Sequence, residues 1–176
     1  MQQHILFINT TYSHEDAFNS CINGDYDNCS FSVVDHAQID PTLVPEGRGS
    51  LMIMTLDSYE NWKGLSGDDY KRKKTEIADK LIRRLERYLP DLRKYIEVME
   101  VATPKAISRF GLSPEGAIYG FSQRPGQSGI NRLSQETKIK GLFLAGAWTR
   151  PGAGVHGCVV SGLDAADLVL KLLRKS

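Results

Sequence analysis

The sequence predicts an α+β fold, in which a mixed or antiparallel sheet with packed helices precedes one further strand and a closing helix. Three observations predict it. Residues 4–9, 30–35 and 50–56 have the β-branched, aromatic or alternating apolar character of strands. A long amphipathic helix follows them, and a glycine-rich turn leads into a final Ala/Leu-rich helix. With 176 residues, of which 41% are hydrophobic, the chain is long enough to bury a core.

The connections between the first three strands are polar or rich in proline and glycine. Residues 21–29 are typical of an exposed turn region, and residues 41–49 contain two prolines and two glycines. These short polar connections favour neighbouring strands of one sheet.

A helix is predicted from Ser66, which resembles an N-cap, to the stop at Pro90. Apolar and aromatic residues fall on one of its faces, namely Tyr70, Ile77, Leu81, Leu85 and Tyr88. Residues 71–87 also carry eight basic and three acidic side chains. Such a face is either a solvated helix surface or a peripheral contact with anionic lipid headgroups.

Two short elements are predicted before a long loop. Residues 96–101 are expected to form a strand, and residues 103–110 a short helix with Pro104 in its first turn. The glycine-rich segment from 111 to 140 is expected to be mainly extended loop.

The final part of the chain predicts a strand, a turn and a helix. Leu142 to Ala145 is a continuous apolar run, as in a strand covered on both faces. Glycines then lead to a helix start near Val155, where free N–H groups favour an anion or an electron-rich carbonyl. The helix shows an apolar stripe, which predicts core packing, at Val155, Val159, Leu163, Ala166, Leu170 and Leu173. A second line of small residues permits close approach of another backbone or a flat ring, at Gly157, Ser161 and Ala165.

Several function classes are excluded. No apolar run approaches the ~18 residues of a membrane span, and the first residues lack the character of a signal peptide, so a cytoplasmic protein is predicted. Cys21, Cys29 and Cys158 predict neither a disulfide framework nor a zinc site, and no metal is expected. No recognition motif accompanies the basic residues, which argues against nucleic-acid binding. His156 has no evident acid partner, so no catalytic residue is assigned.

The run Gly-Ala-Trp-Thr-Arg-Pro-Gly-Ala-Gly-Val, residues 146–155, resembles the C-terminal flavin motif of bacterial-type phytoene desaturases. Related carotenoid desaturases, isomerases and retinol saturases share it, within the wider amine-oxidase-like flavoprotein superfamily. The resemblance implies that residues 116–176 are the C-terminal part of a Rossmann-like FAD-binding domain, and that residues 1–115 are a substrate-binding region. It also implies cofactor contacts for Gly146, Ala147, Thr149, Pro151, Gly152, Ala153, Gly154 and Val155.

The activity implied by the resemblance is hydride transfer to FAD, with desaturation or isomerisation of a carotenoid-like or other apolar substrate. A Gly-x-Gly-x-x-Gly turn after an early strand, which binds the FAD diphosphate in such enzymes, is missing from this sequence. We therefore expect a C-terminal portion of an oxidoreductase that alone binds FAD weakly or not at all. The alternative is a non-catalytic module that binds lipid or a partner. The substrate and the oligomeric state stay open.

Overall fold

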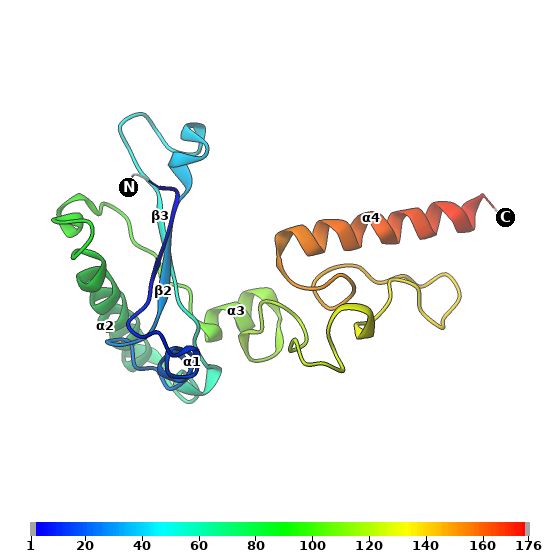
Figure 1. The fold of residues 1–176 in the computed structure, drawn as a ribbon, viewed down its shortest axis with the longest axis horizontal. Helices are drawn as coiled ribbons and strands as arrows, with labels where there is room; N and C mark the ends of the chain where they lie inside the picture. The colour runs from blue at the N-terminus through cyan, green and yellow to red at the C-terminus, as the bar shows by residue number, and fades with distance from the viewer. Residues whose placement is uncertain (1–2, 175–176) are drawn as a thin grey trace. The chain divides into compact units, whose positions relative to one another are not determined.

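The structure, a computed structural model, describes residues 3–174 and divides into two compact units, Met1–Gly111 and Leu112–Ser176. The first unit contains β1 (Ile5–Ile8), α1 (His14–Ile22), β2 (Phe31–Asp35), β3 (Leu51–Met54), α2 (Gly67–Leu85) and α3 (Pro104–Gly111) (Figure 1). The second unit contains one long helix, α4 (Gly154–Leu173), and loops with short 3₁₀ turns.

The three strands form one antiparallel sheet in the order β1-β2-β3. Ile8 pairs with Phe31, and Val33 pairs with both Leu6 and Ile53. An antiparallel sheet packed with helices confirms the α+β class. The three predicted strands are present, each slightly shorter than its expected range.

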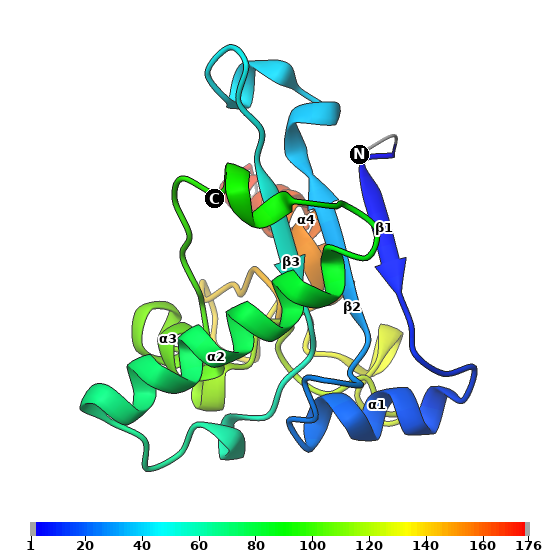
Figure 2. The same ribbon diagram turned by 90° about the vertical axis from the view of Figure 1, so that its left-hand side faces the viewer.

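One face of this sheet is covered by α2, which crosses it as Figure 2 shows. Since side chains alternate along a strand, Ile8, Phe31 and Val33 share the face that α2 covers. They form a core with residues from α1, α2 and the intervening loops, namely Cys21, Tyr26, Cys29, Trp62, Ile77, Leu81 and Leu85. All the buried hydrophobic side chains of residues 3–174 lie between Ile8 and Leu85.

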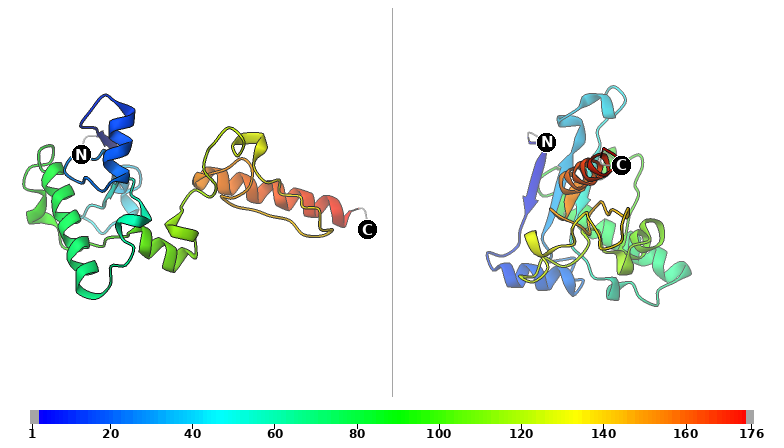
Figure 3. Two further views of the ribbon diagram at one scale, coloured as in Figure 1. Left: turned by 90° about the horizontal axis from the view of Figure 1, so that it is seen from below. Right: turned by 90° about the vertical axis from the view of Figure 1, so that its right-hand side faces the viewer.

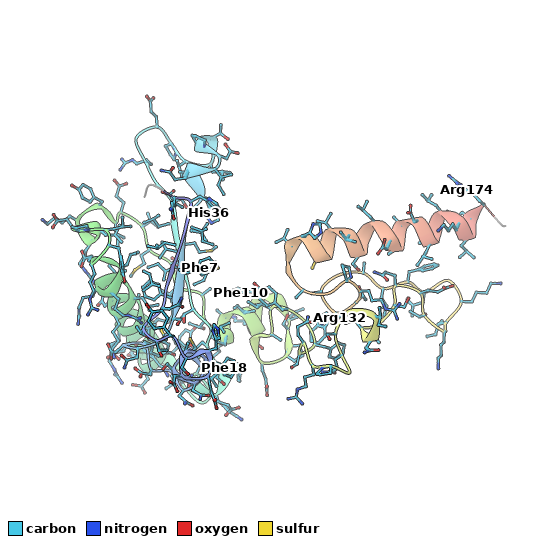
Figure 4. The ribbon with its side chains drawn as sticks, viewed as in Figure 1. Phe7, Phe18, His36, Phe110, Arg132 and Arg174 are labelled. Atoms are coloured by element: carbon cyan, nitrogen blue, oxygen red, sulfur yellow. The ribbon has the colours of Figure 1, made fainter. Side chains whose placement is uncertain are left out.

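The opposite face of the sheet is apolar and open. Phe7 is 68% exposed, and its neighbours on that face, Met52 and Met54, are 40% and 42% exposed. Figure 4 labels Phe7 on the side of the sheet turned away from α2. An exposed apolar patch of this kind marks a surface suited to apolar ligands or partners.

Asp57 joins the core to the loop that precedes α2. Its carboxylate accepts hydrogen bonds from the Tyr26 hydroxyl at 2.8 Å and from the Trp62 indole N–H at 2.6 Å. The Asn61 side-chain amide and the backbone N–H of Ser58 each donate to it at 2.8 Å. Burial, and then the hydrogen bond to Asp57, raise the pKa of Tyr26 well above its ordinary value of 10.0.

The raised pKa of Tyr26 predicts a loss of stability in alkali. The folded state holds the phenol protonated, so this contribution is fully present below pH 10.0, the ordinary tyrosine pKa, and is lost as pH rises above it. We expect the difference in unfolding free energy between the wild type and Tyr26→Phe to shrink above that pH. Urea unfolding between about pH 8 and pH 11 measures it, and a difference that stays constant across this range would contradict the assignment.

Residues 21–29 differ from the expected exposed turn region. The segment starts in the last turn of α1 and then turns into the core, where Cys21, Tyr26 and Cys29 are buried. Mostly polar residues and a glycine separate these three buried side chains in the sequence, so the segment has the composition of a surface turn although part of it is buried. The helix α1 begins at an evident N-cap, since the Ser13 hydroxyl accepts a hydrogen bond from the N–H of Asp16 at 3.2 Å.

Two of the predicted strands do not form. Residues 96–101 are irregular and Val98 is exposed, while Leu142 to Ala145 contain only an isolated bridge between Phe143 and Glu136. The interpretation of 142–145 as a strand covered on both faces is wrong for this chain, since Leu142 and Ala145 are exposed. A strand needs a hydrogen-bonding neighbour, and neither segment has a ladder beside it among residues 3–174.

The basic face of α2 is smaller than its sequence suggests. Arg84 is buried, and Lys80 pairs with Asp27 while Arg72 pairs with Asp69. Arg83 in the last turn of α2 and Arg87 just beyond its end are exposed, so a contact with lipid headgroups stays a prediction for these two. Within residues 3–174, none of the helices is both long and apolar enough to cross a bilayer.

Candidate functional site

The predicted cofactor residues lie in one continuous turn that leads into α4 (Figure 3, left). Gly152 has φ of 123° and Gly154 has φ of 88°, both in the region that favours glycine. A Cβ placed on Gly157 would lie 2.4 Å from the carbonyl oxygen of Gly152. The small residues of α4 therefore admit another backbone, which is one of the two possibilities that their spacing predicts.

The apolar stripe of α4 is exposed, contrary to the expected core packing. Val155 is 85% exposed, and Val159, Leu163, Leu170 and Leu173 are exposed as well. The side of α4 that is buried carries Gly157 and Ser161 instead. The small side packs on the loops of the same unit because it allows the closest approach, and residues 112–174 contain no sheet for the larger side chains to cover.

A buried polar network joins α4 to the turn. The Ser161 hydroxyl accepts a hydrogen bond from the N–H of Gly146 at 3.0 Å and lies 2.5 Å from the Thr149 hydroxyl. The Gln135 side-chain amide donates to the Arg150 carbonyl at 2.5 Å, and more weakly to Ser161 at 3.4 Å. Because these buried groups satisfy one another, the turn has one preferred conformation.

A second set of contacts to the turn comes from Arg132, whose side chain is buried at 3% exposure. Its guanidinium donates to the carbonyl of Phe121 at 3.1 Å and to those of Tyr119 and Thr149 at 3.3 Å, and it also bonds the carbonyl of Ala147. Figure 4 labels this residue among the loops beside α4. One side chain thus connects the segment around residue 120 to the predicted cofactor turn.

The N-terminus of α4 is open to a ligand. Its N-cap is Ala153, which provides no side-chain hydrogen bond, and a Cβ on Gly154 would meet nothing within 4 Å. An open apolar hollow of about 470 Å³ lies at this helix end, lined by Ile118, Tyr119, Gly154, Val155, Cys158 and Val159. Uncapped N–H groups and the positive end of the helix dipole favour a ligand with negative charge or a polarised carbonyl. An apolar wall beside them suits a flat aromatic ring system.

The eight predicted cofactor residues do not contribute in the same way. Thr149 and Gly152 are buried and shape the turn, while Pro151 and Val155 are exposed. Within residues 3–174, no group of three or more His, Cys, Asp or Glu side chains is placed to hold a metal. Arg132 and Gln135 were missed by sequence reasoning, since a glycine-rich segment is typical of a surface loop. Two long polar side chains shortly before a compact turn are the signal that was available.

The comparison with protein families identifies the class of protein. Residues 16–170 match the family of flavin containing amine oxidoreductases, which is nearly the whole chain, and the chain belongs to that family. This confirms the resemblance to amine-oxidase-like flavoproteins drawn from residues 146–155.

Among curated proteins, the chain is similar to prolycopene isomerase 2, chloroplastic, of an Oncidium hybrid cultivar, with 39% identity over 133 residues. It is 38% identical over 133 residues to the chloroplastic prolycopene isomerase of Daucus carota. A 4,4'-diaponeurosporene oxygenase of Staphylococcus aureus strain MW2 is 28% identical over 144 residues. These alignments cover 74%, 74% and 81% of this chain, but only 22%, 22% and 28% of the respective relatives.

Proposed function

We propose that this chain supplies two parts of a flavin-dependent oxidoreductase that acts on a carotenoid-like or other apolar substrate. Residues 116–176 form part of the FAD site, and residues 1–115 form part of the substrate-binding region. The observation that carries the proposal is the glycine turn that ends at the uncapped start of α4, in a chain that belongs to a flavin family. This membership favours an enzyme over the non-catalytic binding module.

The residues present suit the isoalloxazine end of FAD. When bound, FAD accepts a hydride from the substrate, and its reduced form carries negative charge near N1 and the C2 carbonyl. The N–H groups of Gly154 and Val155 and the helix dipole would stabilise that charge. The apolar side chains of the open hollow beside them would contact the ring. The chain alone is expected to bind FAD weakly, because these residues would hold only one end of the cofactor.

The open face of the sheet supports an apolar substrate. Phe7, Met52 and Met54 present adaptable apolar and aromatic surface without an acid or base among them. In a desaturation the flavin would take one hydrogen as a hydride, and the other would leave as a proton to solvent. An isomerisation would leave the number of hydrogens in the polyene unchanged. The names of the relatives, prolycopene isomerase and diaponeurosporene oxygenase, agree with this substrate class.

Co-expression tests the proposal. We expect this chain, produced together with an N-terminal FAD-binding segment of a relative, to give a yellow complex whose flavin absorbance bleaches on reduction. The chain alone is the matched control and is expected to be nearly colourless. A stable complex without flavin would instead support the non-catalytic module.

A further inference from the structure

Arg132 is a buried cation whose hydrogen-bond partners are all backbone carbonyls. None of the ion pairs within residues 3–174 involves it. We propose that Arg132 is a positioning residue for the flavin turn and that its uncompensated positive charge favours the reduced, negatively charged cofactor. This inference rests on the proposed function, which it deepens by naming a residue outside the flavin motif.

The positioning role follows from the geometry of the guanidinium. A planar group with five donors can bond several carbonyls at once, which a lysine ammonium on a flexible chain does less well. Arg132 uses this to join the carbonyls of Tyr119 and Phe121 to those of Ala147 and Thr149. Its Cδ and Nε atoms would also lie 3.2 Å from a Cβ placed on Gly152, so the side chain packs against the turn itself.

The electrostatic role follows from burial without a carboxylate. Carbonyl dipoles solvate the guanidinium but leave its net charge, and removal from water strengthens the field that this charge exerts nearby. The guanidinium contacts the backbone of the turn that leads to the start of α4, and the helix dipole is also positive at that helix start. Both fields favour negative charge on a group bound at the turn.

The first experiment uses the flavin-free chain. We expect Arg132→Lys and Arg132→Met to speed hydrogen exchange about tenfold at the amides of Thr149 and Arg150, which donate to the carbonyls of Gly146 and Leu133. Lys138→Met, which removes an exposed positive charge from the same unit, should leave them unchanged. Unchanged exchange in both Arg132 variants would overturn the positioning role. Faster exchange along all of α4 would also overturn it, in favour of a general role in folding.

The second experiment measures the midpoint potential of the flavin in the co-expressed complex. Arg132→Met should make the potential more negative, while Arg132→Lys, which keeps the charge, and Lys138→Met should stay near the wild type. A wild-type potential in Arg132→Met would overturn the electrostatic role. If the wild-type complex contains no flavin, the proposed function and the electrostatic role both fail, and hydrogen exchange still decides whether Arg132 holds the turn.

Discussion

Replacement of Gly157 by alanine is expected to lower flavin occupancy of the co-expressed complex about tenfold and to destabilise the second unit. The new Cβ would lie 2.4 Å from the Gly152 carbonyl oxygen, a backbone atom that cannot rotate away. Overpacking of this kind costs about 1–3 kcal/mol, and 1.4 kcal/mol is a factor of ten in an equilibrium. The turn must move away from α4, and the predicted cofactor residues move with it.

The control is Gly162→Ala, in the same helix, where a Cβ would meet nothing within 4 Å. Both substitutions improve helix propensity by up to about 1 kcal/mol, so the difference between them isolates the close contact. Thermal melting and the ratio of flavin to protein absorbance measure the two effects. Equal behaviour of the two variants would show that the contact with Gly152 does not hold the turn.

The largest effect on stability is expected for Arg84→Met. The Arg84 guanidinium donates to the carbonyls of Tyr26 at 2.9 Å and of Cys29 at 2.6 Å, and it lies 4.7 Å from the centre of the Phe31 ring. Methionine fills much of the volume but leaves two buried carbonyls without donors. Each such loss costs about 1–3 kcal/mol, so we expect a total near 3–4 kcal/mol, a large part of the stability of a small domain.

Arg83→Met is the matched control for this variant, since Arg83 is the exposed neighbour on the same helix. Its effect should stay within about 0.5 kcal/mol. Urea unfolding followed by far-ultraviolet circular dichroism compares the two. If both variants unfold at the same urea concentration, the Arg84 contacts contribute nothing to stability.

Local patterns predicted the helices and strands that carry their own signals. The periodicity of α2 and the alternation in β2 are such signals, and both elements formed. Ser66 stands at the start of α2 as predicted, but its side chain makes no capping hydrogen bond, and the helix ends at Leu85, before the predicted stop at Pro90. Residues 142–145 show the limit of this reasoning, because an apolar run reports a preference for strand while the strand itself depends on neighbours. For the same reason, the apolar stripe of α4 predicted burial against a sheet, and residues 112–174 contain no sheet for it to pack against.

The glycine turn of residues 146–155 was recognisable as a motif, but the contacts that hold it were not. Glycines 152 and 154 mark a backbone that needs unusual angles, and their spacing is visible in the sequence. The partners of Arg132 are four backbone carbonyls. Every residue has a backbone carbonyl, so the sequence does not show which residues Arg132 contacts. Arg84 in α2 is a parallel case, since its main partners are also carbonyls and it was counted among the surface bases.

The location of the buried apolar side chains, all between Ile8 and Leu85, has a calorimetric consequence. The heat capacity of unfolding rises with newly exposed apolar surface and falls with exposed polar surface. The sheet and α2 therefore carry most of that heat capacity, whereas the second unit encloses Arg132, Gln135, Thr149 and Ser161. The second unit should therefore have a small heat capacity of unfolding, and its free energy of unfolding should curve little with temperature. Cooling would weaken the first unit sooner than the turn that is proposed to hold the flavin.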